Sequence, residues 1–225
     1  MDKKSLYIII SVIVFALAVS FVDAYIMPSY FMKIPIKIIF FLALPMSFFF
    51  IYKDDFSAFK GLFTFKKKGL LLALLLGIGV YTVIVGAFFL TRNIIDFSNV
   101  TSSLTEGMGI TADNLIYVTS YVALLNSFLE EFFFRGYAFI TLKKYSGRKL
   151  AYIFSSSIFA IYHVGMLVGM FSIGALALLL AGLIVGGCIF NYLNEMNGNI
   201  YPSWFVHMFA NFGINTVGFI LFGVI

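Results

Sequence analysis

The stretch NSFLEEFFFRGY, residues Asn126–Tyr137, places two adjacent glutamates and an arginine inside a run that is otherwise mostly phenylalanine, leucine and tyrosine. A charged side chain at the centre of a bilayer opposes insertion by about 2.5–3.5 kcal/mol, so Glu130, Glu131 and Arg135 together oppose it by about 8–10 kcal/mol before any pairing. Charges in such a segment usually face the interior of a helix bundle or a watery cavity. The stretch therefore marks a candidate functional site, provided that it lies within a membrane.

The composition of the whole chain indicates an integral membrane protein. Its 225 residues are 62% hydrophobic and only 11% charged, whereas a soluble domain is usually about half apolar and about a quarter charged. The net charge of +5 does not indicate a nucleic-acid partner, because the lysines lie between apolar runs and form no basic patch. The single cysteine, Cys188, excludes an internal disulfide. With no histidine or charge beside it, we interpret Cys188 as a packing residue.

Apolar runs of the length that crosses a bilayer predict an all-α, polytopic bundle of about seven transmembrane helices, or eight, in one domain over residues 1–225. The first run is longer than the core of a signal peptide, so we expect an uncleaved anchor rather than a cleaved signal. Pro45 is expected to kink the second span, and Pro202 suits the first turn of the last. The predicted spans are residues 5–22, 37–52, 70–90, 115–142, two within 150–193 that separate near 169–174, and one from 202 to the C-terminus.

The distribution of lysine and arginine predicts the orientation of these spans. The N-terminal lysines, the KKKG loop and the KKYSGRK loop are separated by even numbers of spans, so all three can be cytoplasmic. The net acidic segment 91–114 then lies outside, with the N-terminus in the cytoplasm and the C-terminus outside. The GxxxG pairs Gly165/Gly169 and Gly182/Gly186 are interpreted as sites of close helix packing.

Both histidines of the chain also fall within predicted spans, His163 in FAIYHVG and His207 in WFVHMFANFG. Glu130 and Glu131 lie about a dozen residues before the KKYSGRK loop, roughly 18–20 Å along a helix. His163 lies about as far beyond that loop, so these side chains are predicted at similar depth. His207 must reach a compatible level on the last span.

Helical spacing pairs these polar residues further. Glu131 and Arg135 are an i,i+4 pair with the acid first, which is the favourable order. Glu130 is rotated by about 100° from Glu131 and is predicted to lack a local partner. The spacing also predicts that two further pairs share helix faces, Phe159 with His163 and His207 with Asn211. So many polar groups on three helices favour a functional site over an ion-paired brace.

These groups suit the hydrolysis of an acyl bond by activated water. A glutamate without a charge partner in a low dielectric is suited to act as a general base, and a histidine can share in activating water. A second histidine and an asparagine can donate hydrogen bonds to a developing oxyanion. The chain contains no HExxH zinc motif, no GxSxG nucleophile motif and no aspartate pair in its later spans.

Three short motifs resemble those of a known family. EEFFFR, FAIYH and HMFAN resemble the EExxxR, FxxxH and HxxxN motifs of the CPBP family, the CAAX-protease and bacteriocin-processing membrane proteins that are also called Abi proteins and include the Rce1-type endopeptidases. The motifs stand in the family's order, and the resemblance covers residues 126–215 as a catalytic core. It implies an intramembrane endopeptidase in which Glu130 and His163 activate water. His207 and Asn211 would then stabilise the oxyanion, with Glu131, Arg135 and Phe159 in support.

The resemblance leaves several alternatives open. We favour a site without metal, although a zinc ion would be held by Glu130, His163 and His207. The expected partners are the lipid bilayer and a membrane-embedded or lipidated peptide or protein substrate. The alternative function is a non-catalytic bacteriocin-immunity or accessory protein that binds a peptide. A proton pathway is disfavoured because the polar groups cluster at one depth. A chain rich in Phe, Ile and Lys suggests a bacterial cell membrane.

Overall fold

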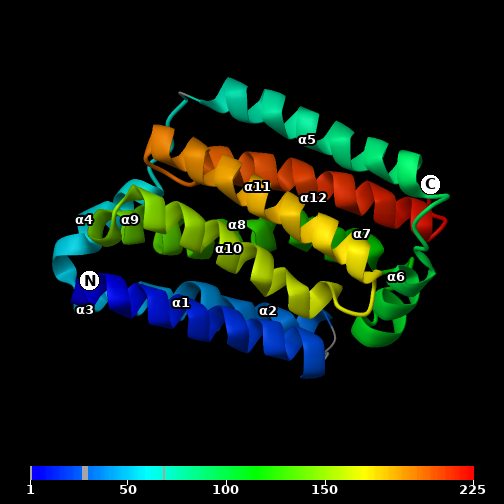
Figure 1. Ribbon diagram of the computed structural model, residues 1–225, viewed down its shortest axis with the longest axis horizontal. Coiled ribbons are helices and arrows are strands. Elements are labelled where there is room, and N and C mark those ends of the chain that lie inside the picture. Colours follow the sequence, from blue (N-terminus) through cyan, green and yellow to red (C-terminus); the bar gives the residue numbers. More distant parts are fainter. Residues whose placement is uncertain (1, 27–29, 68) are drawn as a thin grey trace.

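The computed structural model describes residues 2–26, 30–67 and 69–225, and in these residues the chain is helical without any strand (Figure 1). The predicted all-α bundle is confirmed. The α-helices are α1 (Lys3–Phe21), α2 (Tyr30–Ile38), α3 (Leu44–Ile51), α4 (Phe56–Leu62), α5 (Leu70–Thr91), α6 (Ser98–Ser102), α7 (Leu115–Tyr121), α8 (Ser127–Glu130), α9 (Leu142–Ser146), α10 (Arg148–Leu167), α11 (Ile173–Asn197) and α12 (Tyr201–Leu221). Between them lie the π-helical turns η1 (Val22–Ile26), η2 (Ile39–Ala43), η4 (Ser103–Gly107), η5 (Val122–Asn126) and η6 (Glu131–Thr141), and the 3₁₀ turn η3 (Lys53–Asp55).

Six helical segments among the described residues are long and apolar enough to cross a membrane, and they correspond to six of the seven predicted spans. The predicted break near residues 169–174 falls between α10 and α11. Pro202 lies in the first turn of α12, as predicted. The six segments are Lys3–Ile26, Met32–Ile51, Leu70–Thr91, Arg148–Leu167, Ile173–Asn197 and Tyr201–Leu221.

The remaining predicted span, residues 115–142, is the central helix of the bundle. Helical turns follow one another without a break from α7 through η5, α8 and η6 to α9. This path is not one of the six apolar segments, because polar residues and charges interrupt it. The side chains of Leu129–Phe139 are all buried, so the neighbouring helices shield this segment from lipid.

The other helices pack around the central path in layers. In Figure 1, α1 and α2 lie on one side of the bundle, α11 and α12 lie on the other, and α5 forms the outer edge against α12. α10 lies between α1 and α11 and packs against both. Aromatic side chains fill the space between α1–α3 and the central helix. The rings of Phe41 and Phe133 stack with their centroids 4.3 Å apart, and Phe48 meets Tyr137 edge-on at 5.6 Å.

The second span begins earlier than predicted. The sequence placed its start at Lys37, whereas the helix is already formed at Tyr30 and the apolar segment runs from Met32 to Ile51. The prediction was wrong because a lysine was expected to mark the end of a span. Lys37 instead lies inside it and is buried, since it has polar partners within the bundle. Pro45 stands in the first turn of α3, directly after the π-helical turn η2.

The two termini lie at opposite ends of the bundle (Figure 1), in keeping with an odd number of passages.

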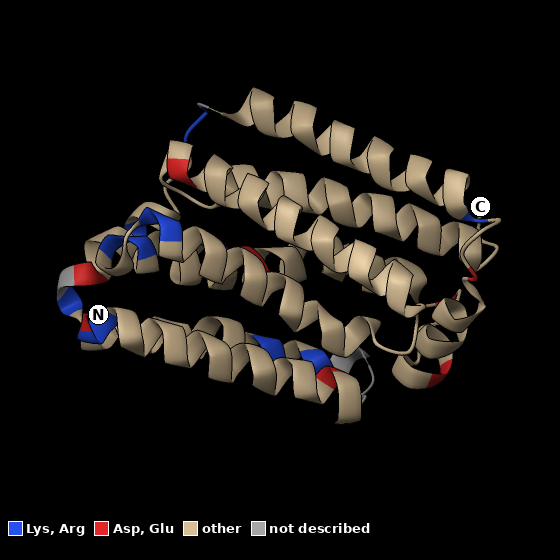
Figure 2. Ribbon diagram, viewed as in Figure 1, with Lys and Arg blue, Asp and Glu red and all other residues tan. Residues whose placement is uncertain are grey.

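Figure 2 shows most lysines and arginines gathered at the N-terminal end. There Asp55 from η3, fully buried, accepts hydrogen bonds from Lys4 at 2.8 Å, Lys144 at 2.6 Å and the Tyr145 hydroxyl. This contact joins α1, η3 and α9 at one end. The predicted orientation of these ends in the membrane stays a prediction.

Of the first glycine pair, only Gly165 makes the close helix contact that was predicted. A Cβ atom at Gly165 would stand 2.5 Å from the Ser20 carbonyl oxygen, so α10 approaches the end of α1 without room for a side chain. Gly169 lies beyond the end of α10 with a φ of +87°, and nothing stands within 4 Å of its added Cβ. Its role is therefore the turn between α10 and α11.

The second glycine pair makes no packing contact among the described residues, so that prediction was wrong. Nothing stands within 4 Å of a Cβ added at Gly182 or Gly186, whereas one at Gly187 would meet the Ser156 Cα at 3.1 Å. The GxxxG motif therefore lies next to a close helix contact of α11, but that contact is made by Gly187 and not by the two glycines of the motif. Cys188 is exposed and its sulfur lies 3.3 Å from the Ser156 hydroxyl, which is not the packing position predicted for it.

Candidate active site

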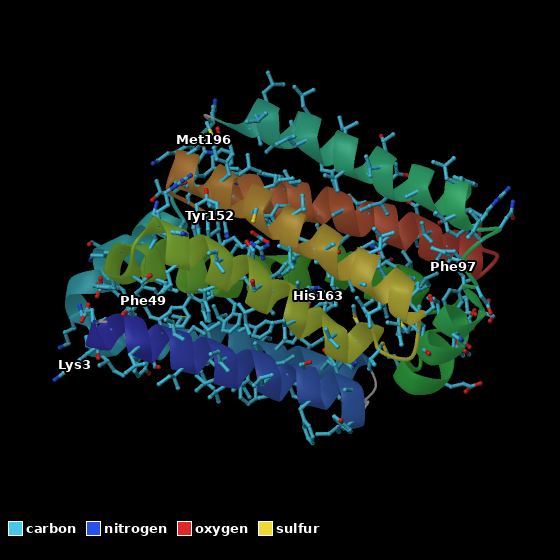
Figure 3. The ribbon with its side chains drawn as sticks, viewed as in Figure 1. Lys3, Phe49, Phe97, Tyr152, His163 and Met196 are labelled. Atoms are coloured by element: carbon cyan, nitrogen blue, oxygen red, sulfur yellow. The ribbon has the colours of Figure 1, made fainter. Side chains whose placement is uncertain are left out.

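Three side chains from separate helices meet inside the bundle: Glu130 from α8, His163 from α10 and His207 from α12. The Nε2 atoms of His163 and His207 lie 3.9 and 3.8 Å from the same carboxylate oxygen, Glu130 Oε2. Figure 3 shows His163 midway along the molecule, away from both ends. The predicted similar depth of the three residues therefore holds in the structure. Glu130 and His207 are buried, and the His163 side chain is 14% exposed.

Each imidazole is oriented by an acceptor at its Nδ1 atom. His163 Nδ1 lies 2.7 Å from the carbonyl oxygen of Phe159, one turn earlier on α10. Because a carbonyl oxygen can only accept, Nδ1 donates to it, and the Nε2 atom faces Glu130. Phe159 and His163 also share a helix face as predicted, with ring centroids 4.7 Å apart.

His207 is held in the same way by a carboxylate. Its Nδ1 atom lies 2.9 Å from Glu131 Oε1, and Ser203, one turn earlier on α12, donates to Glu131 Oε2. An ionised carboxylate can only accept, so Nδ1 donates and the Nε2 atom points toward Glu130. The two adjacent glutamates thus act on opposite sides of one imidazole.

Glu130 has partners that the sequence did not predict. Its Oε1 atom accepts hydrogen bonds from Asn126 Nδ2 at 2.8 Å and from the Tyr162 hydroxyl at 3.3 Å. The Lys37 ammonium of α2 lies 3.6 Å from the same oxygen. The expectation that Glu130 lacks a local or charged partner was therefore wrong. Asn126 stands one turn before it, and Lys37 reaches it from a helix far away in the sequence.

The predicted pairing of Glu131 with Arg135 is confirmed. Arg135 Nη1 lies 3.4 Å from Glu131 Oε1, and both side chains are fully buried. The guanidinium carbon lies 3.9 Å from the ring centroid of Phe159 and 4.8 Å from that of Phe190. These distances are typical of cation–π contacts. Arg135 therefore supports Glu131 electrostatically while packing against the aromatic rings of α10 and α11.

Asn211 is buried one turn after His207 and ties α12 to the central helix. Its Nδ2 atom donates to the Val122 carbonyl oxygen of η5 at 3.1 Å. An amide nitrogen carries two hydrogens, and this bond uses one of them.

The π-helical turns η5 and η6 flank the short α8 that carries Glu130, and such turns recur at functional sites.

The separations between Glu130 Oε2 and the two imidazoles are suited to a bridging molecule. At 3.8 and 3.9 Å they are too long for direct hydrogen bonds, and a single water can bridge polar groups at such a distance. One carboxylate and two imidazoles also form the donor set of many zinc sites. In the described part of the chain, however, no group of three or more His, Cys, Asp or Glu residues is arranged so that it could hold a metal ion.

Four residues at the site were not predicted from the sequence. Asn126 stands four residues before Glu130, and Ser203 four residues before His207, so helical spacing could have found both. Tyr162 is adjacent to His163, but it stands in an aromatic-rich run, and nothing in the sequence distinguishes it from the other aromatic residues there. Lys37 carried one signal, a charge beside an apolar run, and it was interpreted as a boundary.

Comparison with known proteins finds one family. Residues 112–213 match the family described as type II CAAX prenyl endopeptidase Rce1-like, which is a little under half of the chain. The matched segment begins before the predicted core of residues 126–215 and includes all three motifs. Lys37 lies outside it. No curated protein and no solved structure matches the chain.

Proposed function

Since residues 112–213 match the Rce1-like family, we propose that this multi-pass membrane protein is an intramembrane endopeptidase. Its substrate would be a membrane-associated or lipidated peptide or protein. The observation that carries the proposal is the position of Glu130 Oε2, 3.9 and 3.8 Å from the two imidazole Nε2 atoms inside the bundle. A carboxylate and an imidazole that one water molecule can bridge are suited to general-base catalysis.

In the proposed reaction, a water molecule binds between Glu130 Oε2 and His163 Nε2. Its oxygen attacks the carbonyl carbon of the scissile peptide bond while Glu130 takes one of its protons. The carbon becomes tetrahedral and its former carbonyl oxygen becomes negative. The C–N bond then breaks as the proton held by Glu130 passes to the leaving nitrogen. The products are a new carboxyl terminus and a new amino terminus, so the water is consumed in full.

The oxyanion would be stabilised by His207 and by the second amide hydrogen of Asn211. Because His207 Nδ1 faces the Glu131 carboxylate at 2.9 Å, Nε2 would donate to the oxyanion when the ring carries a proton on both nitrogens. Arg135 and Phe159 would keep Glu131 and His163 in place. Removing one oxyanion donor typically lowers kcat by about 10²–10³-fold.

The proposal is tested by cleavage of membrane peptides by purified, reconstituted protein, with the products identified by mass spectrometry. The parent protein is expected to cleave, whereas Glu130→Ala and His163→Ala are not. Cys188→Ser is the matched control, because Cys188 is exposed and contacts none of the site residues. Cleavage by both alanine variants at the parent's rate would exclude this mechanism. A non-catalytic immunity role predicts instead that Glu130→Ala still complements a deletion of the gene.

A further inference from the structure

Two buried lysines face the interior from α2, one helical turn apart. Lys33 forms an ion pair with Asp23 at 2.8 Å, and both side chains are almost fully buried. Lys37 lies 3.6 Å from Glu130 Oε1 and donates a hydrogen bond to Asn126 Oδ1 at 2.8 Å. Because a lysine inside a span is costly, each is retained only with a polar partner. The two lysines differ in one respect, which is that the partners of Lys37 belong to the candidate active site.

Lys37 determines which way the Asn126 amide faces. An ammonium group can only donate hydrogen bonds, so the amide oxygen of Asn126 must point to Lys37. The amide nitrogen then points to Glu130 Oε1, which it reaches at 2.8 Å. Without the lysine, the amide oxygen would lose its donor, and Asn126 would be held only by its bond to the carboxylate.

The donors around Glu130 are divided unequally between its two oxygens. Asn126, Tyr162 and Lys37 all lie near Oε1, at 2.8, 3.3 and 3.6 Å. The imidazole Nε2 atoms lie near Oε2. One oxygen is therefore anchored, and the other faces the two histidines.

We propose that Lys37 is a positioning residue for the reaction proposed above: it fixes the Asn126 amide and, with it, Glu130 Oε1, so that Oε2 is the oxygen that accepts the proton from water. The inference rests on the proposed function. It makes the second span, which lies outside the matched residues 112–213, a part of the catalytic apparatus rather than only a membrane anchor. At 3.6 Å from the carboxylate, Lys37 acts mainly through Asn126 and through its charge.

Lys33 provides the matched control for this role. It is a buried lysine on the same helix with its own acidic partner, so Lys33→Met also removes a buried charge from α2 and leaves an acidic group without its ion pair. We expect Lys37→Met to lower kcat by about 10- to 100-fold with KM within about twofold of the parent's, the pattern of an interaction needed in the transition state. Lys37→Arg should restore most of the loss, and Lys33→Met should leave the kcat of folded protein within about threefold. A kcat for Lys37→Met within twofold of the parent's would overturn the inference.

A second measurement does not depend on cleavage. Thermal unfolding of the parent, Lys37→Met, Glu130→Gln and the double variant forms a double-mutant cycle. If Lys37 holds the Glu130 carboxylate, Lys37→Met lowers the Tm strongly, and adding Glu130→Gln recovers part of that loss because no buried charge is left unpaired. Additive Tm changes would overturn the inference.

The two proposals fail in distinguishable ways. If the parent cleaves and Lys37→Met cleaves equally well, the positioning role is wrong and the proposed function stands. If neither cleaves any membrane peptide, the proposed function is wrong and the catalytic role of Lys37 falls with it. The unfolding cycle would still report whether the two side chains are coupled.

Discussion

A buried carboxylate can serve as a proton acceptor only if one of its oxygens stays open toward the substrate. In Glu130 the hydrogen-bond donors lie at Oε1, and Oε2, which faces the two imidazoles, is the oxygen that would accept the proton. Its neighbour Glu131 is enclosed by Ser203, His207 and Arg135. Glu130 and Glu131 are adjacent and of the same type, but their different contacts give them different roles.

At the scale of single residues we predict that cleavage does not depend on a metal ion. Glu130, His163 and His207 are the ligands that zinc would require. Their imidazole Nε2 atoms lie 3.9 and 3.8 Å from Glu130 Oε2, whereas two tetrahedral ligands at about 2.0–2.2 Å from one zinc ion stand about 3.3–3.6 Å apart. Pre-treatment with a strong chelator, followed by metal analysis of the protein, is expected to leave the cleavage rate unchanged. Loss of activity that added zinc restores would contradict this prediction.

Most residues of the candidate site could be predicted from the sequence. Helical spacing and the three motifs pointed to Glu130, His163 and His207, because periodic polar residues in apolar spans are costly unless they meet. The position of Lys37 could not be predicted, since the rule that lysines flank a span is a statistical one. Only the packing of α2 against the central helix shows that its ammonium has buried partners.

At the scale of elements, the contact between α1 and α10 depends on one missing side chain. Gly165→Leu places a Cβ 2.5 Å from the Ser20 carbonyl oxygen, which is backbone and cannot turn aside. We expect the free energy of unfolding to fall by about 1–3 kcal/mol, as in other overpacked contacts. Thermal unfolding in detergent measures this change.

Gly182→Leu is the control for this contact, because nothing stands within 4 Å of a Cβ at that position. Its Tm should equal the parent's. Equal destabilisation by both substitutions would show that the loss comes from glycine itself and not from the approach of α1. Sequence alone could not separate the two glycines, because both belong to a GxxxG pair and the pattern does not record which face meets a neighbour.

The N-terminal end of the bundle is joined through Asp55. Burial alone would raise the pKa of Asp55, but hydrogen bonds from Lys144 and Lys4 outweigh it and lower the pKa to about 2. The folded-state pKa thus lies below the usual value of 3.8. The stability that Asp55 contributes is therefore complete above about pH 4 and is lost as the pH falls through about 2.

We expect Asp55→Asn to lower the free energy of unfolding at neutral pH by about 1–3 kcal/mol, the usual contribution of hydrogen bonds to a charged group. The difference from the parent should shrink between about pH 4 and pH 2. Chemical unfolding at several pH values measures it, with the exposed Asp113→Asn as control. A difference that stays constant down to pH 2 would exclude the ion pairs as its source.

At the scale of the whole molecule, the predicted orientation follows from charge. Most lysines and arginines gather at the N-terminal end of the bundle (Figure 2), and the other end carries the segment 91–114. We predict that the former end is cytoplasmic. In a Cys188→Ser background, a cysteine at Ser98 should react with a membrane-impermeant maleimide in intact cells. One at Lys60 should react only after the cells are opened, and the reverse result would invert the topology.

The fold could be predicted at this scale because apolar runs of the right length leave few alternatives. Six spans are matched by apolar helices, and the seventh passage forms the central path through α7, α8 and α9. What could not be predicted is which helices meet, since lipid-facing and helix-facing sides of α5 and α11 are equally apolar. The site depends on those contacts.

In the proposed mechanism, Glu130 Oε2 accepts a proton from water in the hydrolysis of a peptide bond. Glu130→Gln isolates this step, because glutamine has the same shape and fills the same space but cannot accept the proton. The rate of cleavage of one membrane peptide by reconstituted protein is expected to fall by about 10²–10⁴-fold, the usual range for general-base catalysis. A rate within threefold of the parent's would exclude Glu130 as the proton acceptor.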